Sequence, residues 1–369
     1  MLSYARVDRW LSRFNGPQTI GHSAPFWGAV LFVIGLGIAV PYIVGGYDLV
    51  NFTGFVLMLF LAMGLCFIWG FCGILSLGQG AFLGLGGYTY GVVGINLIEA
   101  QGNTDVALIA GLIVPVLLAA VLGYFMFYAR LKGVFVAILM LVVTLLFQTF
   151  LNQTAGVQWH IGKAYLGGNN GLGRFSAGIT ELPSLKLGIG DLVYEFVGTS
   201  PAFYYLVFGL AAITFLGLRM MVNSRIGYIM VAIREDPDRT EAFGYDVRLI
   251  QLLVFCVGAL LAAFSGILYV GWGGFIDPSA FGIYNNILPV IWVAVGGRKS
   301  LEATVVSTIF LLWLSQRLAI GGEYAFIVLG GILVIVMMLA PEGVMTSMLD
   351  YWARWRRRGA ASGRRTGDI

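Results

Sequence analysis

The stretch that decides the fold is Val106–Tyr128, which reads VALIAGLIVPVLLAAVLGYFMFY and contains no charged residue. A helix rises 1.5 Å per residue and the hydrocarbon core of a bilayer is about 30 Å thick, so about 20 apolar residues are enough to cross it. A second apolar stretch, 133–152, follows after the short basic link that contains Arg130 and Lys132. The pair predicts two consecutive membrane-spanning helices.

Similar stretches lie on both sides of this pair, and we expect an all-α polytopic membrane protein with about ten transmembrane helices. The eighth and ninth of them are short, and Pro289 is expected to break the eighth. One of these two spans is therefore either re-entrant or kinked, or both cross the membrane fully. The predicted spans are 26–45, 52–71, 77–98, 106–128, 133–152, 202–222, 249–272, 283–297, 303–316 and 324–340.

The composition supports this class of protein. Of the 369 residues, 59% are hydrophobic and 11% are charged, whereas a soluble domain usually carries about 25% charged residues. This excludes a soluble enzyme and a nucleic-acid-binding domain. The three cysteines lie in apolar stretches and are interpreted as core residues, and neither histidine has neighbours typical of a metal ligand set. We therefore expect no metal site, no cofactor and no catalytic residues.

The distribution of Lys and Arg predicts the orientation, because cytoplasmic loops are enriched in both. With ten spans and a cytoplasmic N-terminus, 18 of the 22 basic residues fall on the inner side. Both termini are therefore expected in the cytoplasm. The predicted organisation is a cytoplasmic segment 1–25, a transmembrane domain 26–345 and a basic tail 346–369. The tail is interpreted as a lipid anchor or a merely solubilising segment. An outer loop at about 153–200 and an inner loop at about 223–248 are the long connections.

The chain lacks the sequence features of a self-powered transporter. No ionisable residue lies near the middle of a predicted span, whereas ion-coupled carriers usually bury such groups there. A phosphate-binding loop requires Gly-x-x-x-x-Gly-Lys-Ser/Thr, and the nearest match, Gly162-Lys163, has Val157 and Ala164 at two of the required positions. The protein is therefore passive or driven by a separate subunit.

The inner loop favours a protein that is driven by a separate subunit. Residues 227–235 can form a short helix with apolar and charged surface, and Gly244 supplies a stop signal. Such a helix between two spans is suited to docking in a groove of a partner protein, although an ordinary solvated loop is the alternative. The candidate coupling residues that this reasoning selects are Gly227, Arg234, Glu235, Asp236, Arg239, Glu241 and Gly244.

Several polar side chains recur at helical spacing inside the spans and could line a solute path. Thr144, Gln148 and Asn152 share one face of the fifth span, and Ser76 and Gln79 lie three apart at the start of the third. Thr304 belongs to a similar series in the ninth span. Hydrogen bonding between helices is the alternative role for all of these side chains.

Five stretches in the same order and spacing resemble branched-chain amino acid ABC transporter permeases of the LivM type. The most characteristic is the inner loop, with RIGYIMVAIR at 225–234 and EAFGY at 241–245. The others are SLGQGAFLGLGGY at 76–88, RLKGVFVAI at 130–138, LGGNNGL at 166–172, and IWVAVGG at 291–297 with PEG at 341–343. The resemblance covers roughly residues 50–345. It departs from the family after Gly297, where Arg298–Ala303 replaces a further glycine-rich turn.

The resemblance implies a permease subunit that passes branched-chain amino acids inward across the bacterial inner membrane. It implies a sister permease, two ABC ATPase subunits and a periplasmic solute-binding protein as partners. By position, Ala232, Ile233, Arg234 and Gly244 would belong to the ATPase-docking helix. Urea and short-amide permeases form a close branch and remain the alternative substrate class. A stand-alone channel or an ion-coupled carrier is the competing class of protein.

Overall fold

The computed structural model describes residues 24–173, 182–189 and 192–318, together with Thr19 and five isolated positions between Val328 and Met338. The helical elements are α2 (Ala24–Ile43), α3 (Gly46–Leu65), the π-helical η1 (Cys66–Phe71), α4 (Gln79–Gln101), α5 (Asp105–Tyr128), α6 (Val134–Asn152), η2 (Gly168–Asn170), α7 (Pro201–Val222), α8 (Arg225–Glu235), α9 (Pro237–Ala242), α10 (Val247–Gly273), η3 (Pro278–Phe281), α11 (Ile283–Gly296) and α12 (Leu301–Leu318). Six short strands join them: β1 (His160–Ile161), β2 (Ala164–Tyr165), β3 (Leu172–Gly173), β4 (Leu185–Ile189), β5 (Leu192–Phe196) and β6 (Phe275–Ile276).

The prediction of an all-α polytopic membrane protein is confirmed. Within the described residues, seven helices are long and apolar enough to cross a membrane: α2, α3 with η1, α4, α5, α6, α7 and α10. The predicted eighth and ninth spans correspond to the shorter α11 and to α12. The predicted tenth span falls mostly outside the described residues, as do the N-terminal segment and the basic tail.

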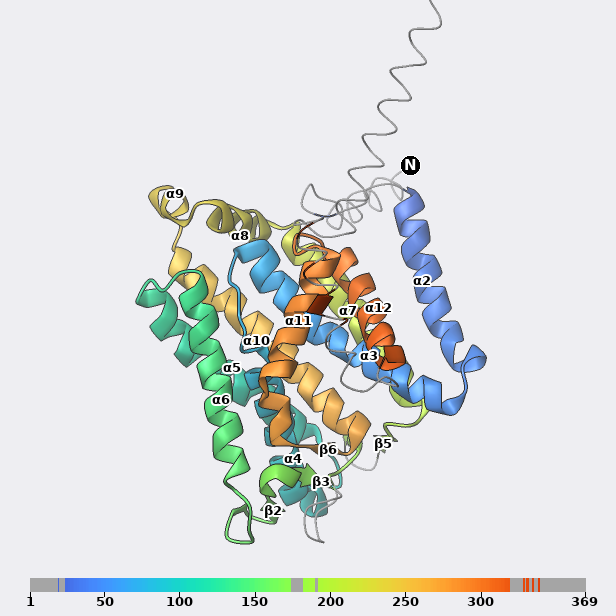
Figure 1. Cartoon of the computed structure of the whole chain (residues 1–369). Coiled ribbons are helices and arrows are strands. Elements are labelled where there is room, and N and C mark those ends of the chain that lie inside the picture. The colour runs from blue at the N-terminus through green and yellow to red at the C-terminus, as the bar shows by residue number, and fades with distance from the viewer. Residues whose placement is uncertain are drawn as a thin grey trace, which may run out of the picture.

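The two ends of the bundle differ in structure. Helices α8 and α9 lie at the end of the bundle at which α2 begins, on the side away from α2, and the short strands lie at the other end (Figure 1). The loops carrying Arg130, Lys132, Arg298 and Lys299 contact or face the α8 and α9 end, so the basic residues that the sequence assigned to one side gather together. The side of the membrane that this end faces stays a prediction.

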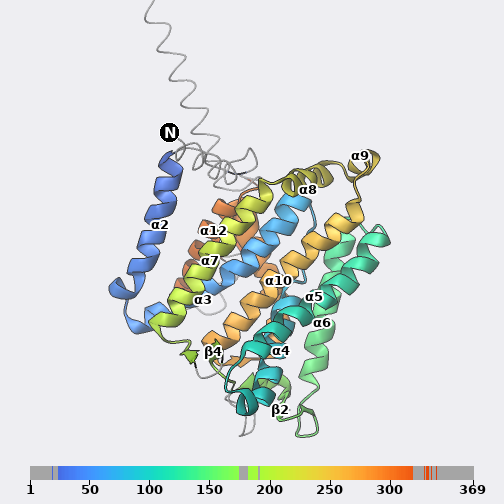
Figure 2. The ribbon, with the colours of Figure 1, turned by 180° about the vertical axis from the view of Figure 1, so that it is seen from behind.

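Helix α10 forms the centre of the bundle and packs against α3, α4 and α5 (Figure 2). Edge-to-face aromatic pairs such as Phe60–Phe264 and Phe82–Phe255 join α10 to α3 and α4. The exposed apolar side chains of α2, α5 and α6 face outward, as they must in helices that contact lipid.

Glycines, among them Gly80, Gly84, Gly87 and Gly91, allow α4 to approach its neighbours closely. A Cβ on Gly84 would lie 2.4 Å from the Phe281 ring, and one on Gly80 would lie within 3 Å of the Asn286 side chain. On α10, a Cβ on Gly266 would lie 2.0 Å from the carbonyl oxygen of Leu83. Without a hydrophobic driving force between helices in lipid, such close packing is a main source of their association.

One expectation about the spans needs correction. Pro289 does not break the eighth span, because α11 runs through it from Ile283 to Gly296. The third span, predicted from residue 77, begins at Gln79 as α4, and the link before it is the extended segment 73–78, which leads from η1 to α4 (Figure 1). This segment is largely buried among helices, where irregular backbone at membrane depth is tolerated.

A buried ion pair fixes α7 to α12 and α2. Arg219 in the last turn of α7 is fully buried and pairs with Glu302 in the first turn of α12. Its guanidinium carbon also lies 4.5 Å from the centre of the Phe26 ring and 5.4 Å from that of Trp27. Removal of one partner would leave an uncompensated buried charge, so we interpret this cluster as structural.

Candidate functional site

Helix α8 lies across one end of the bundle and turns its apolar stripe inward. Gly227, Met230 and Ile233 are buried, and their spacing of three places them on one face of the helix. Gly227 packs so closely on the end of α7 that an added Cβ would lie 1.8 Å from the carbonyl oxygen of Val222. Two predicted coupling residues, Gly227 and Ile233, therefore attach the helix to the bundle, whereas Ala232 is exposed.

Arg234 joins α8 to the membrane-spanning part of the chain. Its Nη1 donates to the carbonyl oxygen of Gly70 in η1 at 2.5 Å, and only 17% of its side chain is exposed. Gly73 packs against the same side chain: a Cβ built there would lie 3.0 Å from Cγ of Arg234. Arg234 thus points into its own chain. A movement of α8 would be passed to η1 and to the extended segment that leads into α4.

Glu235 points outward and is 66% exposed. Its carboxylate accepts hydrogen bonds from Nε and Nη2 of Arg234. These bonds and the charge of Arg234, followed by smaller contributions from Lys299 and Arg298, hold the pKa of Glu235 below its usual value. The charges of Arg298 and Lys299 thus act on Glu235 at the end of α8. They belong to the Arg298–Ser300 turn, part of the segment that departs from the family resemblance.

Helix α9 is capped locally and held by charges from other loops. The Asp236 side chain caps it by accepting from the backbone N–H of Arg239 at 3.0 Å. Lys132 pairs with Asp238, and Arg130 and Arg248 both pair with Glu241 at 3.1 Å. Because exposed pairs of this kind contribute little stability singly, we interpret them as setting the position of α9. Gly244 follows with φ +89°, as a helix stop requires.

Apart from Arg239, which the sequence predicted, the residues most available to a partner at this end were missed by the sequence reasoning. The Phe243 side chain is 82% exposed, and Ile226, Tyr228 and Tyr245 are also exposed. Arg239, four residues before Phe243, is exposed as well. Exposed aromatic side chains together with an exposed arginine have the composition of a protein-binding surface. We call Ile226, Tyr228, Arg239, Phe243 and Tyr245 the docking face. The EAFGY run contains two of these residues, but a sequence does not show which apolar side chains of a loop point away from the bundle.

The candidate path residues Ser76 and Gln79 lie at the break before α4. Both are buried, and the Ser76 hydroxyl accepts from the backbone N–H of Gly78. Neither amide atom of Gln79 has a hydrogen-bond partner among the described residues. The next backbone N–H, that of Gly80, donates to Oδ1 of Asn286 at 2.8 Å. The structure thus brings α11 to this break, and Asn286 was missed because it lies in an otherwise apolar span.

Two of the other candidate path residues lie close to this break. The buried Thr144 hydroxyl donates to the carbonyl oxygen of Met140, which would lie 2.6 Å from a Cβ built on Gly78. Gln148 is half-buried, and its Nε2 would lie 3.5 Å from a Cβ built on Gly282, whereas Asn152 is exposed near the end of α6. The Thr304 hydroxyl donates to the carbonyl oxygen of Ser300, and its side chain also contacts the Cys66 thiol of η1. The path-lining role of the whole set stays a prediction.

The long apolar helices of this bundle define a multi-pass membrane protein, with one short helix pair, α8 and α9, held at its end by contacts with the spans and their loops. Residues 50–339 match the family model of the branched-chain amino acid transport system permease component. The chain belongs to this family and is a multi-pass protein of the bacterial inner membrane.

Individual relatives agree with the family model. The permease protein LivM of the high-affinity branched-chain amino acid transport system of Escherichia coli is 27% identical over 329 residues, which are 84% of this chain and 72% of the relative. LivM of Salmonella typhimurium is 26% identical over the same shares. BraD of Pseudomonas aeruginosa is 27% identical over 38% of this chain and 46% of the relative. No solved structure matches the chain.

Proposed function

We propose that this chain is the membrane-spanning permease subunit of an ABC importer that passes branched-chain amino acids inward. The observation that carries the proposal is the arrangement of α8. Its apolar stripe and Arg234 are fixed to α7 and η1, while Phe243 and its neighbours are left exposed. A self-sufficient channel has no need of such an attached, outward-facing helix pair. The named relatives, which are permease proteins of branched-chain amino acid systems, support the choice of substrate.

In this proposal the energy comes from separate subunits. The chain carries no phosphate-binding motif, so ATP is bound and hydrolysed by ABC ATPase partners that dock on α8 and α9 at the cytoplasmic end. A sister permease completes the membrane part, and a periplasmic binding protein delivers the solute to the opposite end. The membrane lipid covers the exposed apolar faces.

The mechanism that follows is alternating access. Closure of the ATPases moves α8 as a unit, because Gly227, Ile233 and Arg234 attach it to the spans. The movement reaches η1 and the extended segment 73–78, which is a natural hinge because its backbone forms no regular helix. Rearrangement at this hinge would change the position of α4 relative to α11, which meet at Gly80 and Asn286.

Uptake of labelled leucine and labelled urea tests the proposal in cells that produce the complete set of transporter subunits, with and without this chain. We expect leucine uptake to depend on the chain and urea uptake not to. Dependence of urea uptake alone would replace the substrate class and keep the coupling argument. Leucine uptake without any copurifying ATPase would refute the importer assignment.

A further inference from the structure

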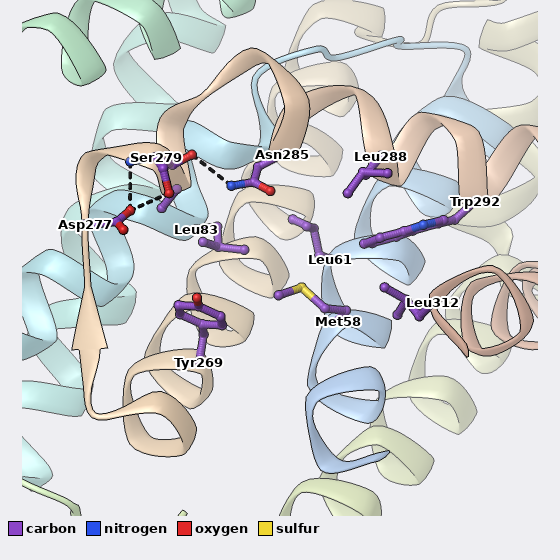
Figure 3. A pocket seen from close by; sticks show the side chains of 11 residues that line it. Met58, Leu61, Leu83, Tyr269, Asp277, Ser279, Asn285, Leu288, Trp292 and Leu312 are labelled. Atoms are coloured by element: carbon purple, nitrogen blue, oxygen red, sulfur yellow. Dashed lines mark hydrogen bonds between the residues drawn. The ribbon is translucent and has the colours of Figure 1, made fainter. Parts of the chain in front are cut away.

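A cavity lies between α3, α4, α10, η3, α11 and α12, away from the docking face. Its volume is about 130 Å³. Figure 3 shows that its wall has two parts: Asp277, Ser279 and Asn285 form one side, and Leu288, Trp292 and Leu312 form the other. Met58, Leu61, Leu83 and Tyr269 lie between them. Asp277 directly follows β6, so the polar side lies toward the strand end of the bundle (Figure 1).

Within the part of the chain that the structure describes, the carboxylate of Asp277 has no cationic partner. Its Oδ1 accepts from the backbone N–H and the hydroxyl of Ser279, which caps η3. Among the described residues, Oδ2 accepts no hydrogen bond, and no Lys, Arg or His forms an ion pair with this carboxylate. A half-buried negative charge beside a cavity attracts a small cation.

Asn285 adds a donor next to this charge. One hydrogen of its amide nitrogen is donated to the carbonyl oxygen of Ser279 at 2.8 Å. A primary amide carries two hydrogens, so the second remains available to an acceptor on a ligand. The polar side of the cavity thus offers a negative acceptor and a neutral donor side by side, which suits the ammonium and carboxylate groups of an α-amino acid.

The opposite side suits an apolar side chain. Apolar carbon atoms of Met58, Leu61, Leu288, Leu312 and the Trp292 ring leave room for a short branched chain but offer it no hydrogen-bond partner. A dry cavity of about 150 Å³ can hold benzene, so the whole cavity of about 130 Å³ has the size of one small ligand. A cavity with a negative charge on one side and an apolar wall on the other would select against urea, because urea has neither an ammonium group nor a hydrocarbon chain.

We propose that this cavity is a transient binding site for the transported amino acid, in which Asp277 binds the ammonium group and the Leu288–Leu312 side receives the branched side chain. The proposal rests on the function proposed above and adds a specificity-determining site within this chain.

The test uses the complete transporter in lipid nanodiscs without the binding protein, so that binding to the permease is observed alone. Saturation-transfer NMR on the methyl signals detects weak ligands. The probes are leucine, 3-methylbutylamine, which lacks the carboxylate, and 4-methylpentanoate, which lacks the ammonium group. We expect leucine and the amine to bind and 4-methylpentanoate to bind at least tenfold more weakly, because a hydrogen bond to a charged group contributes roughly a factor of ten or more.

Asp277→Asn keeps an oxygen to cap η3 and removes the charge. It should weaken leucine and 3-methylbutylamine at least tenfold but should not weaken 4-methylpentanoate, whose carboxylate no longer meets a like charge, while the matched control Asp105→Asn should change none of the three. Leu288→Trp should reduce leucine binding more than the binding of alanine, used as a fourth probe, by filling the apolar side. Equal binding of all probes to wild type, or full leucine binding to Asp277→Asn, would overturn the site.

ATP-driven leucine uptake by the wild-type transporter is measured in parallel, so that the two proposals can fail separately. Absence of uptake with intact, Asp277-dependent binding of the amine would refute the proposed transport function and support the ammonium site. Normal uptake by the wild type, together with leucine binding that neither Asp277→Asn nor Leu288→Trp changes, would refute the site. The proposed transport function would then still be supported.

Discussion

The exposed aromatic ring at position 243 gives the sharpest test of the docking face. Phe243 is 82% exposed and follows α9 directly, so its side chain contributes almost nothing to the packing of this chain. Phe243→Ala should therefore change the free energy of unfolding by no more than about 0.5 kcal/mol, the range typical of surface substitutions. Any large effect of this variant must then arise in a complex.

The size of that effect follows from the area that the ring still exposes. Full burial of a phenylalanine side chain contributes about 1.5–3 kcal/mol, and each 1.4 kcal/mol corresponds to a factor of ten in Kd. If the ATPase buries this ring, Phe243→Ala should weaken its binding roughly 10- to 150-fold. Central aromatic residues of an interface often have effects of this size.

The assay is a titration of the purified ATPase into nanodiscs that contain the permease, with Kd read from ATPase-bound label. Phe135→Ala is the matched control, because Phe135 is 71% exposed but lies in the predicted lipid-facing helix α6. It should leave Kd unchanged. A Kd for Phe243→Ala within twofold of wild type would refute the reasoning, and so would an equal loss in both variants.

Three further predictions follow. Gly70→Ala should lower the free energy of unfolding by about 1–3 kcal/mol, because its Cβ would lie 1.7 Å from the carbonyl oxygen of Arg298. Gly209→Ala is the control, because its Cβ would meet open space and should not lower this free energy. Thermal unfolding in detergent compares the two variants. Arg234→Ala should lower the unfolding temperature and leucine uptake, because the hydrogen bond from Arg234 to Gly70 is lost, but the ATPase should still copurify with this variant. Loss of copurification at an unchanged unfolding temperature would show that Arg234 faces the partner instead. Because the pKa of Glu235 is lowered in the folded protein, its stabilising contribution is present above its unfolded pKa of about 4.3 and is lost as the pH falls through the folded value. Below about pH 4, the stability of the wild type should therefore fall more steeply than that of Glu235→Gln. Parallel pH profiles of the two proteins would contradict this.

Much of the architecture follows from one-dimensional hydropathy. Lipid requires about 20 apolar residues per crossing, and within the described residues helices occupy nine of the ten predicted spans, from α2 to α12. The family resemblance rests on short motifs and was equally visible in the sequence. The inner loop was predicted as a short helix over 227–235, and the structure has a helix from Arg225 to Glu235.

Hydropathy does not encode which neighbour a buried residue meets. Pro289 signalled a break but lies inside a continuous α11. The gap between two predicted spans indicated a link before α4, but it did not indicate that this link is largely buried among helices. The partners that approach the α4 glycines, such as Phe281 and Asn286, come from segments about 200 residues away.

The sequence by itself therefore determined that the chain crosses the membrane many times, where the crossings lie, and that one inner loop forms a short helix with charged surface. Only the tertiary structure decided the direction in which each side chain of that loop points. Arg234 turns inward because the carbonyl oxygen of Gly70 accepts its hydrogen bond and Gly73 leaves room for its side chain, while Phe243 is 82% exposed within the part of the chain that the structure describes. The same holds for Asp277, which the sequence places in a plain connecting loop. Its position beside an apolar cavity arises from the packing of six separate elements, which no local pattern specifies.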